Sequence, residues 1–262
     1  MDENSIPELI EDALKNVGID EGDTIFVHSD STAIRNLTHL GWLEALEILK
    51  NCFLNVLGNK GTLIVPTFNW DFCKGKKYNH QTTRSKVGMF TGYVLSDKRA
   101  IRSTHPIYSF AGIGPDVDKL FNEISNSSFG ENSVFHRLHR IDAKVVFFNT
   151  SFNECTFVHY VEQKIGVDYR FLKQFEGTVV NNGHETTGTY DFYARYLEKN
   201  IEPRFEKLRT DLLSSHKMVE AFLCEQYSIS QVSCADIYAV AQQGLNSDPW
   251  YLIKQPNNEQ HL

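Results

Sequence analysis

The densest group of reactive side chains lies between residues 143 and 162, in the stretch AKVVFFNTSFNECTFVHYVE. An apolar run, Val145 to Phe148, stops at a polar turn, and helical spacing then connects Glu154, Cys155, Thr156, His159 and Glu162. Open α/β sheets place their chemistry beyond the carboxyl ends of buried strands, where the chain turns into a helix. We therefore predict that this stretch carries the central functional groups.

His159 is the strongest candidate for a general base, because the ordinary imidazole pKa lies near neutrality. If this segment is helical, Glu162 lies one turn after His159 and Cys155 one turn before it, on the same face. Either Glu162 or Glu154 could orient the imidazole and stabilise its protonated form. His105 is a further catalytic candidate, and a structural role for it is equally compatible with the sequence.

Two alternative chemistries use the same residues. A thiol in the first turn of a helix can have a lowered pKa, so Cys155 could form an acyl-enzyme intermediate, although a packed cysteine is the commoner situation. A hydrolytic metal site could use His28, Asp30 and His159. Only His28 and Asp30 stand at ligand spacing, and we predict no metal.

Strand-like runs lead into two other polar clusters. Residues 24–28 precede Ser29 to Thr32, which could bind an anion at a helix N-terminus or, more commonly, cap the helix. Residues 62–66 precede Thr67 to Asp71, where Trp70 and Asp71 could line a substrate cleft. Alternation of strands and helices up to residue 162 predicts an α/β fold, three-layer α/β/α with a mostly parallel (mixed) central sheet. We expect one domain over residues 1–262.

The C-terminal third is expected to add a hairpin and helices. The Asn182-Gly183 pair predicts a tight turn in a hairpin over residues 178–187, which would give the sheet an antiparallel edge. Helices are expected over residues 191–197, 207–227 and 234–244.

Bulk properties exclude several classes of protein. The net charge of −7 over 262 residues argues against nucleic acid as the main partner. Five cysteines without a C-x-x-C pair indicate neither a disulfide framework nor a zinc knuckle. An acidic N-terminus and the lack of a long apolar run predict a cytoplasmic protein without signal peptide or membrane span. Dinucleotide-binding and P-loop glycine motifs do not occur.

Six short motifs occur in the order seen in one family: Val27-His28-Ser29, Gly61 to Phe68, Ser85 with Gly88, Arg102 to Ser109, Gly130 with Ser133, and Thr156-x-x-His159-x-x-Glu162. The chain resembles the aminoglycoside 3-N-acetyltransferase family, most clearly between residues 26 and 162. The resemblance implies an enzyme that transfers an acyl group, acetyl or larger, from coenzyme A to a primary amine of a sugar-like acceptor. It also makes His159 the candidate catalytic residue, and we expect direct transfer with His159 as the base.

The remaining predicted site residues divide into a coenzyme A side and an acceptor side. On the coenzyme A side the resemblance implies His28, Ser29, Ser31, Thr67, Ser85, Arg102, Ser103 and Ser109. On the acceptor side we expect Trp70, Asp71, Tyr108, Asn153, Asp191 and Arg195.

The chain departs from the family at three places. Tyr108 and Asn153 stand where histidine and aspartate are frequent, and residues 189–195 are aromatic where an acidic loop often receives a polycation. Rings stack on bases and arginines such as Arg170 and Arg195 pair with phosphates, so we expect a nucleotide-linked amino sugar slightly ahead of an aminoglycoside. The departures also leave open a non-catalytic acyl-coenzyme A-binding module. A homodimer is compatible with the sequence.

Overall fold

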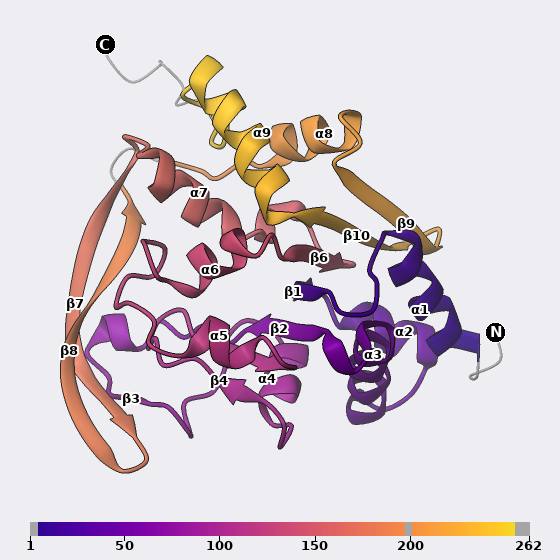
Figure 1. Ribbon diagram of the computed structural model, residues 1–262, viewed down its shortest axis with the longest axis horizontal. Helices are drawn as coiled ribbons and strands as arrows, with labels where there is room; N and C mark the ends of the chain where they lie inside the picture. The colour runs from indigo at the N-terminus through magenta and orange to yellow at the C-terminus, as the bar shows by residue number, and fades with distance from the viewer. Residues whose placement is uncertain (1–4, 197–200, 255–262) are drawn as a thin grey trace.

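The computed structural model describes residues 5–196 and 201–254, which are built around a seven-stranded sheet with the strand order β4-β5-β2-β1-β6-β10-β9 (Figure 1). Its strands are β1 (Thr24–Ser29), β2 (Thr62–Pro66), β4 (Ile101–Arg102), β5 (Phe110–Ile113), β6 (Lys144–Phe148), β9 (Met218–Cys224) and β10 (Tyr227–Ser233).

The three middle strands are parallel and the pairs outside them are antiparallel. β1 pairs in parallel with both β2 and β6, whereas β5 pairs antiparallel with β2 and β10 pairs antiparallel with β6. The middle strands are apolar almost throughout and buried, as expected for strands that are covered on both faces. The predicted α/β fold with a mixed central sheet is confirmed, with parallel pairing confined to its centre.

Helices cover both faces of the sheet. Side chains alternate along β1, so that Ile25 and Val27 pack into one hydrophobic core and Phe26 packs into the other. The first core takes its helical residues from α1 (Ser5–Asn16), α2 (Thr32–Thr38), α3 (Trp42–Leu57) and α4 (Met89–Leu95). The second takes them from α5 (Val117–Phe121), α6 (Val134–Arg140), α7 (Phe157–Ile165), α8 (Glu206–Ser214) and α9 (Cys234–Ser247).

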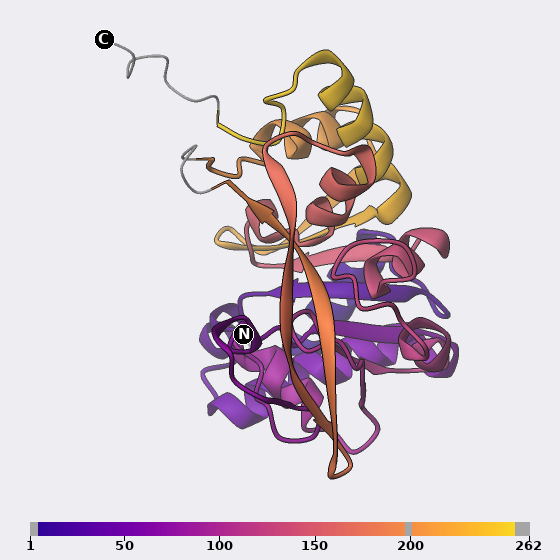
Figure 2. The same ribbon diagram turned by 90° about the vertical axis from the view of Figure 1, so that its left-hand side faces the viewer.

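The Asn-Gly hairpin belongs to a second sheet. β7 (Arg170–Asn181) and β8 (His184–Arg195) pair along their whole length, and β3 (Tyr78–Asn79) pairs with β7. Asn182 and Gly183 have φ angles of 49° and 79°, the left-handed conformation that a two-residue hairpin turn requires. The predicted turn is confirmed, but its placement at the edge of the main sheet was wrong. Figure 2 shows the hairpin running along one side of the molecule, across the layers.

Two expected helices are wholly or partly replaced by strands. Residues 191–195 belong to β8, because register with β7 determines their conformation, and Leu197 lies outside the described residues. The helix expected over 207–227 ends at Ser214, where His216 adopts a φ of 56°, and the chain then forms β9 and β10. The helix expected from residue 234 is confirmed as α9.

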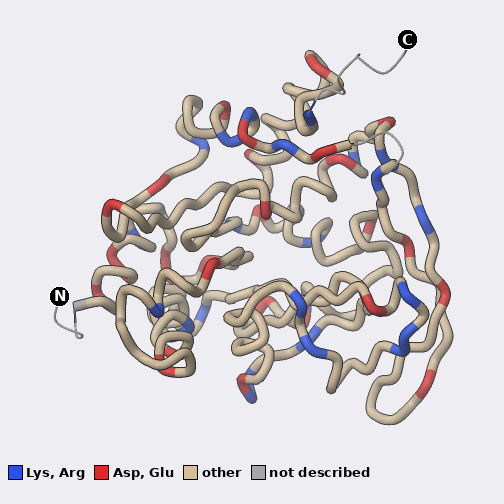
Figure 3. The backbone as a smooth tube through the Cα atoms, turned by 180° about the vertical axis from the view of Figure 1, so that it is seen from behind, with Lys and Arg blue, Asp and Glu red and all other residues tan. Residues whose placement is uncertain are grey.

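Charges are interspersed over the fold. Figure 3 shows lysine and arginine mixed with aspartate and glutamate along the chain, without a large region of one sign in that view. No helix in the described part of the chain is both long and apolar enough to cross a membrane.

The turn after β5 gives a test of this packing. Gly114 has a φ of 135°, and a Cβ atom there would lie 2.4 Å from the carbonyl oxygen of Gly61. Gly75 also has a positive φ, 78°, but a Cβ atom there would meet no atom within 4 Å. We expect Gly114→Ala to lower the free energy of unfolding by more than about 3 kcal/mol, and Gly75→Ala by about 1–2 kcal/mol. Urea denaturation measures both, and equal losses would contradict the close approach.

Candidate active site

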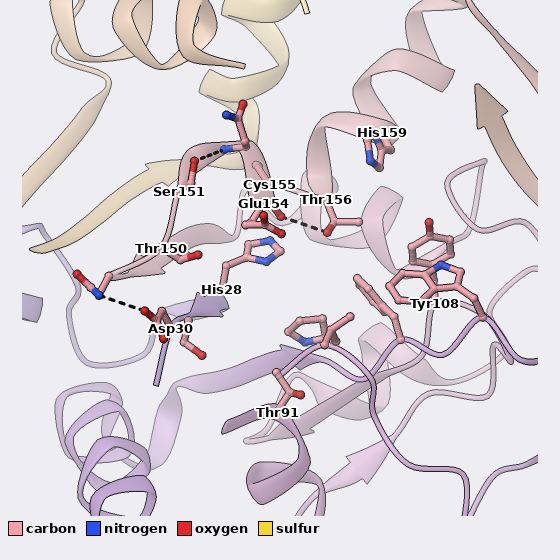
Figure 4. Close-up of a pocket in the computed structure, with 17 residues that line it drawn as sticks. His28, Asp30, Thr91, Tyr108, Thr150, Ser151, Glu154, Cys155, Thr156 and His159 are labelled. Carbon is pink, nitrogen blue, oxygen red and sulfur yellow. Dashed lines mark hydrogen bonds between the residues drawn. The ribbon is translucent and has the colours of Figure 1, made fainter. Parts of the chain in front are cut away.

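A cleft of about 540 Å³ opens at the carboxyl ends of the parallel strands (Figure 4). β1 and the segment after β2 form one side of it, and the turn after β6 and the start of α7 form the other. Its lining comprises His28, Ser29, Asp30, Pro66, Phe68, Trp70, Val87, Thr91, Tyr108, Asn149, Thr150, Ser151, Asn153, Glu154, Cys155, Thr156 and His159. The stretch that the sequence singled out therefore supplies one whole wall.

His159 and Glu162 lie on one face of α7, as their spacing predicts. His159 Nδ1 is 2.8 Å from Glu162 Oε2, while the His159 side chain retains 22% exposure and Glu162 retains none. The rings of Phe129 and Phe205 stand edge-on to the imidazole, with centroids 5.7 and 6.1 Å away. Glu162, rather than Glu154, is thus the carboxylate that holds His159.

Two residues of the following segment complete this cluster. Gly166, with a φ of 85°, ends α7 and lets the chain turn back. Tyr169 then donates its hydroxyl to Glu162 Oε1 at 3.0 Å, and Arg170 Nε forms an ion pair with Glu162 Oε2 at 2.7 Å. Arg170 Nη2 also lies 3.0 Å from His159 Nδ1. We call His159, Glu162, Tyr169 and Arg170 the histidine cluster.

The histidine cluster favours a neutral imidazole beside a charged carboxylate. Burial and the positive charge of Arg170 lower the pKa of His159, and the hydrogen bond to Glu162 opposes them only in part. Burial by itself would raise the pKa of Glu162, but the charge of Arg170 and the bond to His159 outweigh it, so this pKa is lowered.

Cys155 lines the cleft but does not have the lowered pKa that a nucleophile would need. The residue is fully buried, and burial raises the pKa of its thiol to about 12. The possibility of an activated thiol therefore lacks its physical basis.

His28 and Ser29 end β1 at the cleft. Burial lowers the pKa of His28 to about 3, and neither His28 Nε2 nor Ser29 Oγ has a hydrogen-bond partner in the described structure. Asp30 accepts hydrogen bonds from the backbone and hydroxyl of Thr32, so this cluster caps the seven-residue helix α2. Ser31 is buried behind the cleft wall.

Four other predicted coenzyme contacts form a buried network outside the cleft lining: Thr67, Arg102, Ser103 and Ser109. Arg102 donates to the Ser109 hydroxyl at 3.2 and 3.1 Å and to the carbonyl oxygen of Thr83 at 2.5 Å. The Ser103 hydroxyl accepts the N–H of Phe110. Because the Arg102 guanidinium already donates to protein acceptors and lies outside the cleft lining, its expected place on the coenzyme A side was wrong. Ser85 is likewise bonded to Thr91, at 2.8 Å.

His105 is also structural. Its Nδ1 accepts the backbone N–H groups of Ile107 and Tyr108, and its Nε2 lies 3.2 Å from the carbonyl oxygen of Asn126. Backbone groups thus occupy both ring nitrogens, and the residue is absent from the cleft lining. The prediction of a catalytic His105 was therefore wrong.

The residues predicted on the acceptor side divide into two groups. Trp70, Tyr108 and Asn153 line the cleft, although Asn153 also bonds Glu206 and the N–H of Phe205 at the start of α8. The other three lie outside the lining and bond to protein: Asp71 to Lys86 and Lys76, Asp191 to Gln174, and Arg195 to the carbonyl oxygen of Ile201. Asp191 and Arg195 are displaced because their segment is strand β8.

Sequence reasoning missed several lining residues. Nothing in the sequence marked Thr91 on α4 as a lining residue, because only the packing of this helix brings it to the cleft. Asn149, Thr150 and Ser151 lay inside the polar turn already noted, and the position of a turn after a parallel strand could have identified them. In the described part of the chain, no group of three or more His, Cys, Asp or Glu side chains is arranged to hold a metal ion.

Known proteins share this fold. The model of the aminoglycoside 3-N-acetyltransferase family matches residues 26–246, which is most of the chain. The chain belongs to this family. Among its relatives are the SPbeta prophage-derived aminoglycoside N(3')-acetyltransferase-like protein YokD of Bacillus subtilis (strain 168) and the aminoglycoside N(3)-acetyltransferase IX of Micromonospora chalcea.

Both relatives are distant. The first is 23% identical over 181 residues, 60% of this chain but only 64% of the relative, which is less than two thirds of its length. The second is 23% identical over 233 residues, 77% of this chain and 80% of the relative.

Solved structures agree in fold with this member of the family. Aminoglycoside acetyltransferase AAC(3)-Xa superimposes with a TM-score of 0.79 at 18% identity, over 96% of this chain and 98% of that one. AAC-IIIb with bound CoASH gives a TM-score of 0.77 at 16% identity, over 92% and 96% of the chains.

The burial of His105 predicts a pH-dependent stability. Burial lowers its pKa to about 4, so between pH 6.5 and 4 the unfolded chain binds a proton that the folded one does not. Stability must then fall as the pH falls, by up to about 1.4 kcal/mol per pH unit from this group. We expect His105→Asn, whose amide oxygen can still accept the two N–H groups, to flatten the slope measured by urea unfolding. A slope unaffected by His105→Asn would contradict this assignment.

Proposed function

We propose that this protein is an acyl-coenzyme A-dependent N-acyltransferase that acylates a primary amine of an amino sugar by direct transfer. The observation that carries the proposal is the histidine cluster: a neutral imidazole on the cleft wall, held by a buried carboxylate. Membership of the acetyltransferase family supports the same reaction class.

His159 is the proposed general base. Its Nδ1 can serve only one partner at a time, and the charged Glu162 at 2.8 Å is the better acceptor for an Nδ1–H. This tautomer leaves the lone pair of Nε2 available to take a proton from the attacking amine. Such assistance typically contributes about 10²–10⁴-fold in rate.

Arg170 is the proposed positioning residue for this base. It keeps Glu162 ionised, and its positive charge opposes protonation of His159 before the substrate arrives. Its Nη1 also donates to the carbonyl oxygen of Tyr193, so the guanidinium joins α7 to both strands of the hairpin. Because its guanidinium is already bound to Glu162 and Tyr193, Arg170 is not free to bind a phosphate group of the acceptor.

The coenzyme side of the cleft is proposed to be the end of β1 and its surroundings. The unpaired Ser29 hydroxyl and the Thr150 hydroxyl in the same lining offer donors and acceptors for the amides of a pantetheine arm. The volume of about 540 Å³ suits the thioester end together with an acceptor ring.

The acceptor is proposed to be a cationic amino sugar of the aminoglycoside kind. The preference for a nucleotide-linked sugar rested on the aromatic residues of 189–195 and on Arg170 and Arg195 as phosphate partners, and both guanidinium groups already bond to protein. Glu154 lines the cleft, and its carboxylate makes no hydrogen bond within the described chain, so it can receive an ammonium group. Trp70 and Tyr108 offer rings against which a sugar can pack.

The proposal can be tested directly. Acetyl-coenzyme A and longer acyl-coenzyme A thioesters would be incubated with the protein and a panel of aminoglycosides and nucleotide-linked amino sugars, with thiol release and acceptor mass as readouts. We expect release that depends on the acceptor and a product heavier by one acyl group. Tight coenzyme A binding without release for any amine would instead favour a non-catalytic binding module.

Two substitutions separate direct transfer from an acyl-enzyme route. We expect His159→Ala to lower kcat by about 10²–10⁴-fold, because the amine loses its base. Cys155→Ala should retain most of the activity, because its thiol is protonated and buried. Initial rates measured at varied concentrations of the acyl-coenzyme A and of the amino sugar check both expectations. A loss of activity with Cys155→Ala as severe as with His159→Ala would contradict direct transfer.

Arg170 should set the pH dependence of the enzymatic activity on the acid side. Besides Glu162, the charged groups that act on His159 are Arg170 and Arg195, and both lower its pKa. Activity needs neutral His159, so it falls as the pH drops through this pKa. Removing one positive charge raises the pKa, and we expect Arg170→Met to move the acid limb of kcat/KM upward by about 1 pH unit.

Arg170→Lys is the matched control, because it keeps the charge without the planar fork. Its acid limb should stay near that of the wild type even if kcat falls. An unmoved limb in a folded Arg170→Met variant would refute this role.

A further inference from the structure

A second histidine lines the same cleft and has no assigned step. His28 ends β1, opposite Phe147 in the register with β6. Its ring stacks on Phe147, with centroids 5.6 Å apart at 17°, and meets the ring of Phe26 edge-on at 4.6 Å. The residue is only 6% exposed. These two contacts hold the imidazole in one orientation at the wall of the cleft.

One nitrogen of this ring, Nε2, has no partner in the described part of the chain. His28 Nε2 is buried without a hydrogen bond, and the same holds for the neighbouring Ser29 hydroxyl. An unpaired buried polar atom costs roughly 1–3 kcal/mol, and native structures rarely keep one without a reason. His159 differs, since its Nδ1 has both Glu162 and Arg170 beside it. In Figure 4 the two histidines come from different elements, β1 and α7, and border one cavity.

The surroundings of His28 determine which ligand group it can serve. Burial lowers the pKa of His28 to about 3, so the imidazole is neutral near pH 7. A neutral ring between phenyl groups is a poor partner for phosphate, which favours cations. A neutral N–H is suited to a carbonyl oxygen, because it can stabilise growing negative charge without losing its own proton.

We propose that His28 is a catalytic residue that donates a ring N–H to the carbonyl oxygen of the bound thioester. The inference rests on the proposed acyl transfer and adds a second role to the same cleft. As the amine attacks, the N–C bond forms and the carbonyl π pair moves to the oxygen, where the hydrogen bond from His28 strengthens. His159 takes the proton from the amine nitrogen. The pair on the oxygen then re-forms the C=O bond of the amide as the C–S bond breaks, the thiolate leaves with the C–S electron pair, and the proton on His159 passes to it.

The most specific test needs no turnover. Acetyl-coenzyme A labelled with ¹³C at the carbonyl would be bound without acceptor, and the C=O stretch recorded by difference infrared spectroscopy. We expect the wild-type complex to show a lower stretching frequency than free acetyl-coenzyme A, and His28→Phe to return it to the free value. An unshifted wild-type band, or the same shift in His28→Phe, would overturn the proposal. Failure of acetyl-coenzyme A to bind the wild type would overturn the proposed function with it.

Kinetics give an independent readout. We expect His28→Phe, which preserves the aromatic packing, to lower kcat by about 10²–10³-fold while KM for acetyl-coenzyme A changes little. His28→Gln keeps an N–H donor and should recover a large part of this loss. Equal kcat in wild type and His28→Phe, or an effect on KM alone, would contradict a role in the transition state.

His80→Phe is the matched control. His80 is another histidine whose ring, at Nδ1, has a buried nitrogen without a partner, but it lies on the loop after β3, outside the cleft lining. It should show wild-type rates and a wild-type carbonyl shift, with thermal unfolding confirming that all variants are folded. An equal loss in His80→Phe would show that the effect of His28→Phe is not specific to the cleft.

Discussion

The buried ion pair between Glu162 and Arg170 is the interaction on which the rest of the site depends. A carboxylate with no exposure would be strongly destabilising alone, and here the guanidinium of Arg170, the hydroxyl of Tyr169 and the imidazole of His159 surround it. The same guanidinium opposes protonation of the imidazole. One pair of charges thus fixes both the orientation and the protonation state of the proposed base.

The fold explains why these groups can meet. The cleft forms where β2, β1 and β6 end together, and α7 follows the turn after β6, so His159 faces the end of β1. Arg170 arrives from the second sheet, because Gly166 ends α7 and directs the chain into the hairpin. The hairpin therefore reaches Glu162 and His159 through its first residue, Arg170, rather than forming an edge of the main sheet. At the opposite side, the aromatic packing of His28 leaves a neutral donor at the cleft.

Local patterns in the sequence predicted what depends on local geometry. Spacing along α7 placed His159 and Glu162 on one face but left Glu154 open as the orienting carboxylate, and the Asn182-Gly183 turn was correct. The patterns failed where long-range contacts decide the role of a residue. An arginine such as Arg102 is typical of a phosphate ligand, but here its guanidinium donates to the hydroxyl of Ser109 and to loop carbonyl oxygens. Residues 191–195 became a strand because β7 was available to pair with them. The role of Arg170 could not be read from the sequence, because it depends on how α7 packs against the hairpin.

The account depends most on His159 being a neutral base with its Nδ1 proton directed at Glu162. ¹⁵N NMR of the histidine side chains, titrated from pH 8 to 5, measures both properties. The account predicts a protonated Nδ1 and an unprotonated Nε2 at neutral pH, with His159 taking up its second proton only below the usual histidine pKa. A doubly protonated His159 at pH 7, or a neutral form with the proton on Nε2, would contradict it.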